Sequence, residues 1–382
     1  MCVNLAGIDF QRGLLMSDND SKTILPDYLP FIDWMKFLGM LVIVYGHSPG
    51  GWLWRPTDPF NIKQLGVVCF VFATGVSLSR EHRTQARILF NRLFDMYAIG
   101  IGYALILSAI TYFSLQELSL SNYSPYVFGV NVFFNFFPAN PTTWYIGMYL
   151  HLIVLWLILL RHVRVQFWMI VASAVMEVPI RAVLMHNAGD FVAYMLITNW
   201  LTVFLAGLWI GQNGAKVRNE IGSALLLAMG MLGLLLVWPQ FISVFFGEVE
   251  QYSFPFMRIS MDGTLSTLFT TSIAVTFLYL IYLIFIYQTT LRLPASKVVK
   301  FFARNTVFVF VVHIPLVFYF SEVFYENVES VLLRAIISIL VYYVLLAIIS
   351  EILFYRLRLL DGIRALTERS IGFSLSKAGI KF

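Results

Sequence analysis

The sequence predicts an all-α polytopic membrane protein with about ten transmembrane helices. Its 382 residues are 59% hydrophobic and only 12% charged, whereas a soluble domain is about 25% charged. The mean hydropathy is +0.78. Apolar stretches of about 20 residues, the length that crosses a bilayer as a helix, recur along the chain. They lie at 31–48, 62–79, 93–114, 142–160, 165–186, 191–212, 220–238, 264–287, 304–321 and 331–355.

Basic residues are concentrated in alternate connections between these stretches, and the positive-inside rule assigns those connections to the cytoplasm. They are Arg12, Lys22, Arg80, Arg83, Arg87, Arg92, Arg161, Arg164, Lys216, Arg218, Arg292, Lys297, Lys300, Arg304 and the basic residues of the tail. The opposite connections carry many carboxylates, such as Glu248, Asp262 and Glu322. The charge asymmetry and the even number of spans predict a multi-pass protein of the plasma (inner) membrane with both termini in the cytoplasm.

We expect three regions along the chain. Residues 1–29 form a cytoplasmic extension, residues 30–355 a membrane domain, and residues 356–382 a basic cytoplasmic tail. Residues 1–28 lack the apolar core and the cleavage site of a signal peptide. Met16 begins a segment typical of a natural start, so we expect residues 1–15 to be dispensable.

Composition also argues against some classes of protein. The pI near 9.1 would suit a nucleic-acid-binding protein, but basic residues spread over loops between apolar spans indicate membrane topology instead. Cys2 and Cys69 are far apart in the sequence, so no disulfide framework or zinc ligand set is implied. We expect no metal and no nucleic-acid partner, and the sequence leaves the oligomeric state open.

The first apolar stretch carries ionisable residues on one helical face. Asp33 and Lys36 have the i, i+3 spacing at which helical side chains meet. His47 follows Lys36 by eleven residues, which returns to nearly the same face about 16 Å further along the axis. Ionisable groups inside a membrane helix are expensive and point to function. This stripe therefore predicts one wall of a protein-lined or water-filled cavity, with His47 as a proton acceptor.

A second group of residues lies at a cytoplasmic connection and in the ninth span. Arg80 and Arg83 follow a span rich in small residues, and paired guanidinium groups there would suit a phosphate-bearing ligand. His313 lies mid-span, two residues before Pro315, and a proline in a membrane helix frees a backbone carbonyl. His313 is either a partner of His47 across a cavity or a residue in an ordinary interhelical hydrogen bond.

Two further features have competing interpretations. The connection at 115–141 is aromatic and poor in charge. It is more typical of an interfacial segment, although a lid with stacking surfaces for a sugar is the alternative. Glu177 and Arg181 in the fifth span are spaced i, i+4 and are expected to pair with each other.

Together these residues resemble the membrane acyltransferase 3 family. Asp33-x-x-Lys36 followed by His47 resembles the family's opening motif, and the late helix with His313-x-Pro315 resembles its Tyr-Leu-x-His-x-Pro helix. The other matching pieces are the segment 70–75 (FVFATG, with Thr74 where the family has serine), Arg80-x-x-Arg83, Trp144-Tyr145-Ile146 and Asn305 at the start of the late helix. The resemblance covers roughly residues 30–355.

The resemblance implies an O-acyltransferase that uses cytoplasmic acyl-CoA (acetyl-CoA or succinyl-CoA) and acylates a hydroxyl group of a glycan or a lipid-linked sugar of the cell envelope. The implied catalytic residues are His47, Asp33, Lys36 and His313. The implied cofactor-binding residues are Arg80, Arg83, Asn305 and Thr74, and the implied substrate-binding residues are Trp52, Trp144 and Tyr145. The alternative from another class is a proton-coupled secondary transporter that uses the same intramembrane groups as a relay.

Overall fold

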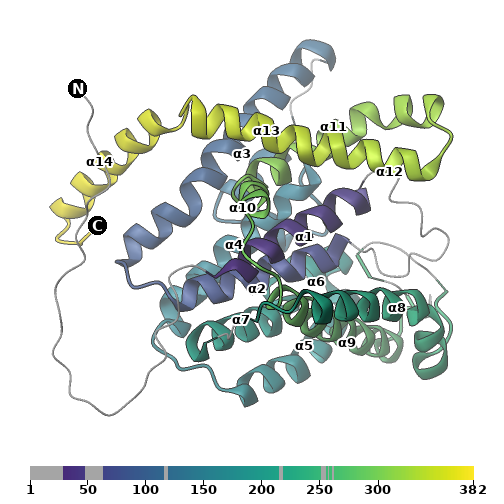
Figure 1. Cartoon of the computed structure of the whole chain (residues 1–382). Helices are drawn as coiled ribbons and strands as arrows, with labels where there is room; N and C mark the ends of the chain where they lie inside the picture. Colours follow the sequence, from purple (N-terminus) through teal and green to yellow (C-terminus); the bar gives the residue numbers. More distant parts are fainter. Residues whose placement is uncertain are drawn as a thin grey trace.

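The computed structural model describes residues 29–47, 63–115, 119–214, 218–250, 255–256, 258–259 and 262–382. These residues form helices and no β-strand, which confirms the predicted all-α class. In Figure 1 the long helices run side by side as one bundle, and α1 lies within it between α2 and the helices near the C-terminus. Residues 1–28, which include Cys2 and Met16, and residues 48–62, which include Trp52, lie outside the described residues.

The helices of the first half begin with α1 (Pro30–His47), α2 (Lys63–Ser79) and α3 (Gln85–Leu115). Three short 3₁₀ helices follow, η2 (Leu120–Tyr126), η3 (Val130–Phe133) and η4 (Pro141–Thr143). Next come α4 (Trp144–Leu155) with its π-helical extension η5 (Trp156–Leu160), α5 (Phe167–Asn187), α6 (Asp190–Met195), η6 (Ile197–Asn199) and α7 (Leu201–Asn213).

The second half contains α8 (Ile221–Phe246), α9 (Leu265–Thr290), α10 (Lys297–Arg304) and α11 (Thr306–Asn327). One further long helix consists of α12 (Val331–Ile339), η7 (Leu340–Leu345), α13 (Leu346–Ser350) and η8 (Glu351–Arg356), and α14 (Asp361–Lys377) ends the chain. Side-chain oxygens of Thr264, Ser296 and Ser330 accept backbone N–H groups at the starts of α9, α10 and α12. These caps satisfy donors that a helix start leaves open.

Fewer helices than predicted are long and apolar enough to cross a membrane. Within the described residues there are six, or seven if α10 and α11, bent by 63°, count as one span. The prediction of about ten is therefore not confirmed, for three physical reasons. The α1 helix carries Asp33 and Lys36. The α2 helix has 17 residues, or about 25 Å, against a core of about 30 Å. The stretch 191–212 is broken between α6 and α7.

Glycines let α1, α2 and α7 pack closely at the centre of the bundle. A Cβ atom on Gly39 of α1 would lie 2.9 Å from the Gly66 carbonyl oxygen of α2. On the other side of α2, a Cβ on Gly75 would clash with the Phe204 carbonyl of α7. Small residues of this kind are how membrane helices approach each other, so the glycine after Thr74 has a packing role.

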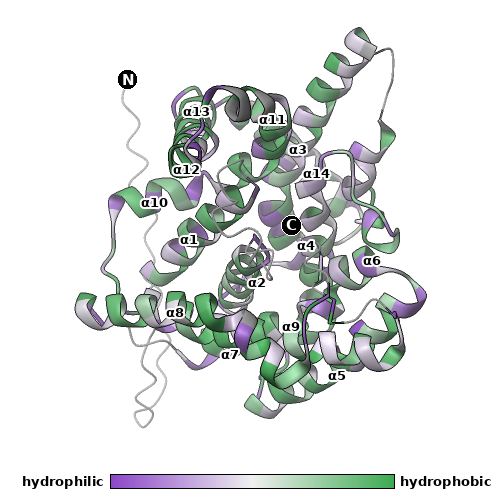
Figure 2. Ribbon diagram, turned by 90° about the vertical axis from the view of Figure 1, so that its right-hand side faces the viewer, coloured by the Kyte–Doolittle hydropathy of each residue, from purple (hydrophilic) through white to green (hydrophobic). Residues whose placement is uncertain are grey.

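The outward faces of the bundle are apolar. In Figure 2 the ribbon of α8 is coloured mostly as hydrophobic. Large exposed side chains include Trp168, Val175, Leu226, Met229 and Phe269. Apolar surface of this extent is expected where lipid is the surrounding solvent. The chain is therefore a multi-pass membrane protein.

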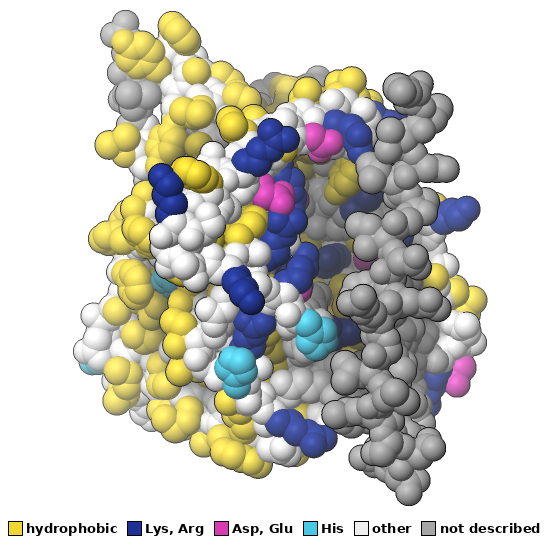
Figure 3. Space-filling view, turned by 90° about the vertical axis from the view of Figure 1, so that its left-hand side faces the viewer, with side chains coloured by type: hydrophobic (Ala, Val, Ile, Leu, Met, Phe, Trp, Pro, Cys, Tyr) yellow, Lys and Arg dark blue, Asp and Glu magenta, His cyan; other side chains and the backbone are white. Residues whose placement is uncertain are grey.

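The bundle end that carries α14 is basic. Figure 3 looks at this end and shows Lys and Arg side chains gathered around a hollow in its surface. The α14 helix is tied to α3 by an ion pair between Arg364 and Asp95 (2.9 Å) and by one between Glu368 and Arg87. We call this the basic end, and the end that carries His47 the opposite end.

A segment of short helices, residues 119–143, packs against the opposite end. Asn131 is fully buried and donates to the Trp144 carbonyl of α4 (3.2 Å). Asn140 donates through Nδ2 to the Val311 carbonyl of α11 (2.8 Å). Phe128, Phe133, Phe134 and Phe136 are exposed on its surface. The segment therefore joins α4 to α11 while it presents aromatic side chains outward.

Candidate active site

Two cavities lie along α1, one toward each end of the bundle. The first has a volume of about 120 Å³ and we call it the Lys36 cavity. The second has a volume of about 310 Å³ and we call it the His47 cavity. The Lys36 cavity is lined by Lys36, Phe70, Thr74, Ser77, Arg92, Tyr145, Tyr149, Thr306 and Phe310, among others. The His47 cavity is lined by Gly46, His47, Lys63, Phe137, Pro141, Thr142, Trp144, Ile314, Val317 and Phe318.

His47 and His313 meet between these cavities. His47 Nδ1 lies 3.1 Å from His313 Nε2, and the ring centroids are 5.2 Å apart. His313 is fully buried, whereas His47 borders the His47 cavity. His313 is thus the partner of His47, but through a direct interhelical hydrogen bond and not across a cavity, so the contact alone does not separate the two interpretations of His313. Residues 266 apart in the chain thus form one polar pair.

The hydrogen bonds of His313 determine which nitrogen of His47 carries a lone pair. His313 Nδ1 lies 2.9 Å from the Val309 carbonyl oxygen and 3.0 Å from that of Phe310. A carbonyl only accepts, so Nδ1 of neutral His313 carries its proton and Nε2 is the acceptor. His47 must then donate through Nδ1, which leaves His47 Nε2 unprotonated. The pair presents a base oriented by a second group, an arrangement typical of active sites.

Three aromatic rings cluster on the wall of the Lys36 cavity, and one of them also lies beside the histidine pair. Phe70, Tyr145 and Phe310 all line the Lys36 cavity, and their ring centroids are 5.4 to 6.4 Å apart. The Phe310 ring is also 6.3 Å from that of His313. Trp144, the neighbour of Tyr145, lines the His47 cavity. We call Phe70, Tyr145 and Phe310 the aromatic partition.

Among the residues that the structure describes, two cations and no carboxylate line the Lys36 cavity. Lys36 comes from α1 and Arg92 from α3. The Arg92 side chain is 23% exposed, and its Nη2 is 3.3 Å from the Ser77 carbonyl oxygen and 3.5 Å from a carboxylate oxygen of Glu81. Its Nε is buried and makes no hydrogen bond to the residues that the structure describes. Cations and hydroxyl groups around one cavity form a site for an anionic ligand.

Arg92 was missed by sequence reasoning because it belongs to a run of basic residues that the positive-inside rule already explains. The feature that could have identified Arg92 was the position at which α3 begins. The helix begins at Gln85, before the apolar stretch that starts at residue 93, so Arg92 lies two turns inside it.

The paired arginines that the sequence singled out are placed differently from Arg92. Arg80 follows the end of α2 and does not border either cavity. Arg83 donates through Nε and Nη2 to the two carboxylate oxygens of Glu81, both at 2.6 Å. These hydrogen bonds lower the pKa of Glu81 below its usual value and raise that of Arg83. The planar fork of Arg83 is therefore occupied by a carboxylate of its own chain.

The other predicted site residues divide between the cavities and their borders. Thr74 borders the Lys36 cavity, and its hydroxyl donates to the Phe70 carbonyl (2.8 Å). Asn305 lies at the bend between α10 and α11, where its Nδ2 is 3.2 Å from Glu351 Oε2. Asp33 lies one turn before Lys36 and borders neither cavity.

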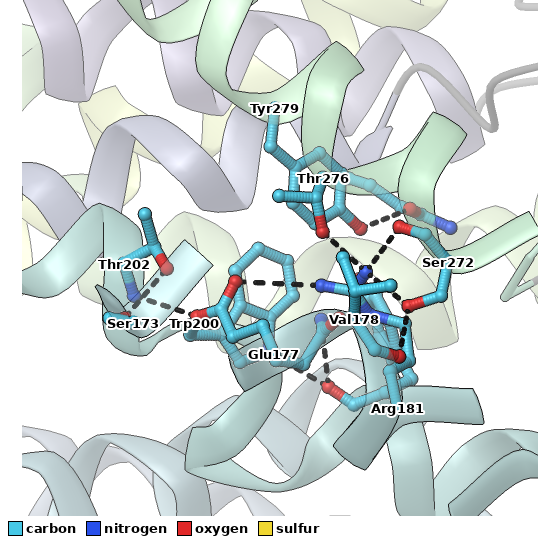
Figure 4. Close-up of polar contacts among 12 residues, drawn as sticks. Ser173, Glu177, Val178, Arg181, Trp200, Thr202, Ser272, Thr276 and Tyr279 are labelled. Atoms are coloured by element: carbon cyan, nitrogen blue, oxygen red, sulfur yellow. Dashed lines mark hydrogen bonds and ion pairs between the residues drawn. The ribbon is translucent and has the colours of Figure 1, made fainter. Parts of the chain in front are cut away.

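The predicted pair of Glu177 and Arg181 is confirmed as the centre of a closed polar network (Figure 4). Arg181 Nη2 lies 3.6 Å from Glu177 Oε2, and Arg181 also donates to Asn199 Oδ1 (2.6 Å). It makes further hydrogen bonds to Ser272 and Thr276 of α9. The network joins α5, α7 and α9, and its members line neither cavity. We assign it to helix packing.

Comparison with known proteins identifies the family of the chain. A family model described as an acyltransferase domain matches residues 29–355. The chain therefore belongs to this acyltransferase family, the membrane acyltransferase 3 family that its motifs resemble. No curated protein and no solved structure matches the chain.

Proposed function

We propose that the protein is an integral-membrane O-acyltransferase. It moves an acyl group from cytoplasmic acyl-CoA to a hydroxyl group of a glycan or lipid-linked sugar of the cell envelope. The acyl group is acetyl, with succinyl as the second candidate. In this proposal the protein lies in the inner membrane, and both termini and the basic end face the cytoplasm. The observation that carries the proposal is the oriented pair of His47 and His313 between two cavities.

His47 is the general base in this mechanism. Its unprotonated Nε2 accepts the proton of the acceptor hydroxyl as that oxygen attacks the thioester carbonyl carbon. A carbon–oxygen bond forms, the carbon–sulfur bond breaks, and the thiolate of CoA leaves and takes up the proton. His313 holds the Nδ1–H of His47 and stabilises the imidazolium that forms, so it is a positioning residue.

The spacing along α1 supports a donor that extends from the basic end. Lys36 and His47 are separated by about 16 Å along the helix axis. About thirteen bonds join the thioester sulfur of acyl-CoA to its first phosphorus. An extended chain advances ~3.5 Å for every three bonds, so this arm spans about 15 Å. With its diphosphate at Lys36 and Arg92, the thioester reaches the histidine pair.

The His47 cavity is the acceptor site in this proposal. Its volume of about 310 Å³ and its aromatic walls, Phe137 and Trp144, suit a sugar ring that stacks on apolar faces. Thr142 supplies a hydroxyl group to the same wall. In this proposal Lys36 and Arg92 bind the donor in place of Arg80, Arg83 and Asn305. Lys36 and Arg92 line the Lys36 cavity, and the other three residues do not.

The test combines donor binding with acyl transfer in the variants His47→Gln and His313→Gln. We expect wild-type protein in detergent to be stabilised by acetyl-CoA in a thermal-shift assay, and both variants to retain that shift. Mass spectrometry of surface glycans from cells that express wild type should show one added acyl group, which cells with His47→Gln lack. Normal acylation by His47→Gln would refute the general base. The absence of any acyl-CoA effect on wild type would favour the transporter alternative.

A further inference from the structure

Pro315 leaves a backbone acceptor open beside the histidine pair. Residue 315 of a helix normally donates its N–H to the carbonyl of residue 311, and proline has no N–H. The Val311 carbonyl oxygen is therefore without its helical partner, in a buried part of α11. An unsatisfied carbonyl in such a place is costly. His313 lies between the two residues, so the local geometry of α11 sets the direction of its ring.

Asn140 replaces the missing N–H. Its Nδ2 donates to the Val311 carbonyl at 2.8 Å, and Asn140 is only 4% exposed. The orientation of its amide is fixed because its Oδ1 accepts the Thr142 hydroxyl at 2.9 Å. Its own backbone N–H donates to Asn122 Oδ1, also at 2.9 Å. Hydrogen bonds thus hold both the side-chain amide and the backbone of Asn140, so its Nδ2 is a rigid donor to α11.

This hydrogen bond connects the wall of the His47 cavity to the turn that carries His313. Thr142, bound to Asn140, lines that cavity. Val311 lies within two residues of His313, whose Nδ1 is held by the carbonyls of Val309 and Phe310 in the same turn. A shift of this turn would change the 3.1 Å contact between His313 and His47. Contacts of that length tolerate little displacement.

We infer that Asn140 is a positioning residue for acyl transfer: through the carbonyl that Pro315 frees, it fixes the α11 turn that orients His313 and thereby His47. This inference rests on the proposed function for its effect on turnover. Its structural part, the coupling between Asn140 and Pro315, can be measured without activity. A packing role alone would lower stability without changing kcat of the folded enzyme.

The experiment uses Asn140→Ala, Pro315→Ala and the double variant in the full-length protein. Pro315→Ala returns an N–H to position 315, so the helix can satisfy Val311 itself. We expect Asn140→Ala to lower kcat about tenfold with donor and acceptor KM changed less than twofold. In the Pro315→Ala background, Asn140→Ala should change kcat less than twofold. The same rescue should appear in the unfolding temperature in detergent.

Asn131→Ala is the matched control, because Asn131 is equally buried in the same segment but donates to α4. Pro315→Ala should not rescue its loss of stability. Equal loss of kcat from Asn140→Ala in both backgrounds, or an unchanged kcat in the original background, would overturn the inference. If Asn140→Ala does not fold, the double variant is compared with Pro315→Ala instead. A large loss of kcat in the double variant relative to Pro315→Ala would overturn the inference. Rescue of stability without CoA-dependent transfer by wild type would instead refute the proposed function.

Discussion

Removal of the Arg92 guanidinium should weaken binding of the acyl-CoA donor and leave the acyl-transfer step unchanged. Arg92 lines the Lys36 cavity beside Lys36, and its Nη2 makes long contacts of 3.3 and 3.5 Å to Ser77 and Glu81. Arg92→Gln keeps a polar side chain of similar length. Because His47 lies about 16 Å along α1 from Lys36, which lines the same cavity as Arg92, we expect the change to act on binding alone.

The magnitude follows from the kind of contact that is lost. A hydrogen bond to a charged group contributes about 1.5 to 3 kcal/mol. The Arg92 side chain is 23% exposed, and solvent screens such a contact, so the lower end of that range applies. A loss of about 1.5 kcal/mol corresponds to an increase of roughly tenfold in the donor dissociation constant.

The assay compares acetyl-CoA with S-acetylpantetheine, which has the same arm and thioester but no diphosphate. Wild type should bind acetyl-CoA more tightly, and Arg92→Gln should reduce this preference about tenfold by weakening acetyl-CoA only. Arg369→Gln is a suitable control, because Arg369 is a cation of α14 that lines neither cavity. An equal loss for both donors would show that Arg92 shapes the cavity and does not bind phosphate. Unchanged binding of both would refute its role entirely.

Two further predictions concern ion pairs. Arg83 lowers the pKa of Glu81 in the folded protein. The pair therefore stabilises above the unfolded pKa and loses its effect as the pH falls through the depressed value. Thermal unfolding of wild type and Glu81→Gln between pH 8 and pH 4 should show a constant difference of under about 1 kcal/mol that shrinks only at the acidic end; a difference that grew with acid would contradict this. In the buried network, Glu177→Leu leaves the Arg181 charge uncompensated and should cost about 3 kcal/mol or more. The double variant Glu177→Leu/Arg181→Met should recover much of this loss in the same assay, and no recovery would show that packing rather than charge is decisive.

Much of the site could be predicted from local sequence because helical periodicity fixes which side chains share a face. Lys36 and His47 were placed on one stripe by their spacing alone, and both line cavities along α1. Pro315 indicates a freed carbonyl, although the sequence does not identify the donor that binds it. The pair of Glu177 and Arg181 followed from i, i+4 spacing and is present at 3.6 Å.

The remainder depended on contacts between segments that periodicity does not relate. Nothing local indicates that Asn140 would reach Val311, 171 residues away. Arg83 looked like a phosphate ligand because RxxR places two cations together, but Glu81 lies within reach and occupies its fork. The predicted number of spans is not confirmed, in part because hydropathy cannot detect a helix that breaks between α6 and α7 within an apolar run.

The aromatic partition has a consequence for the membrane potential. A passage that admits a pantetheine arm is also wide enough for water and protons, and each elementary charge that crosses dissipates about 2.3 kcal/mol per 100 mV. Phe70, Tyr145 and Phe310, with centroids 5.4 to 6.4 Å apart, line the Lys36 cavity, and the Phe310 ring also lies 6.3 Å from that of His313. Rings can turn aside for a ligand and return when it leaves. In the proposed enzyme, the three side chains would form an electrical seal, so that acyl transfer across the bilayer would not discharge the membrane potential.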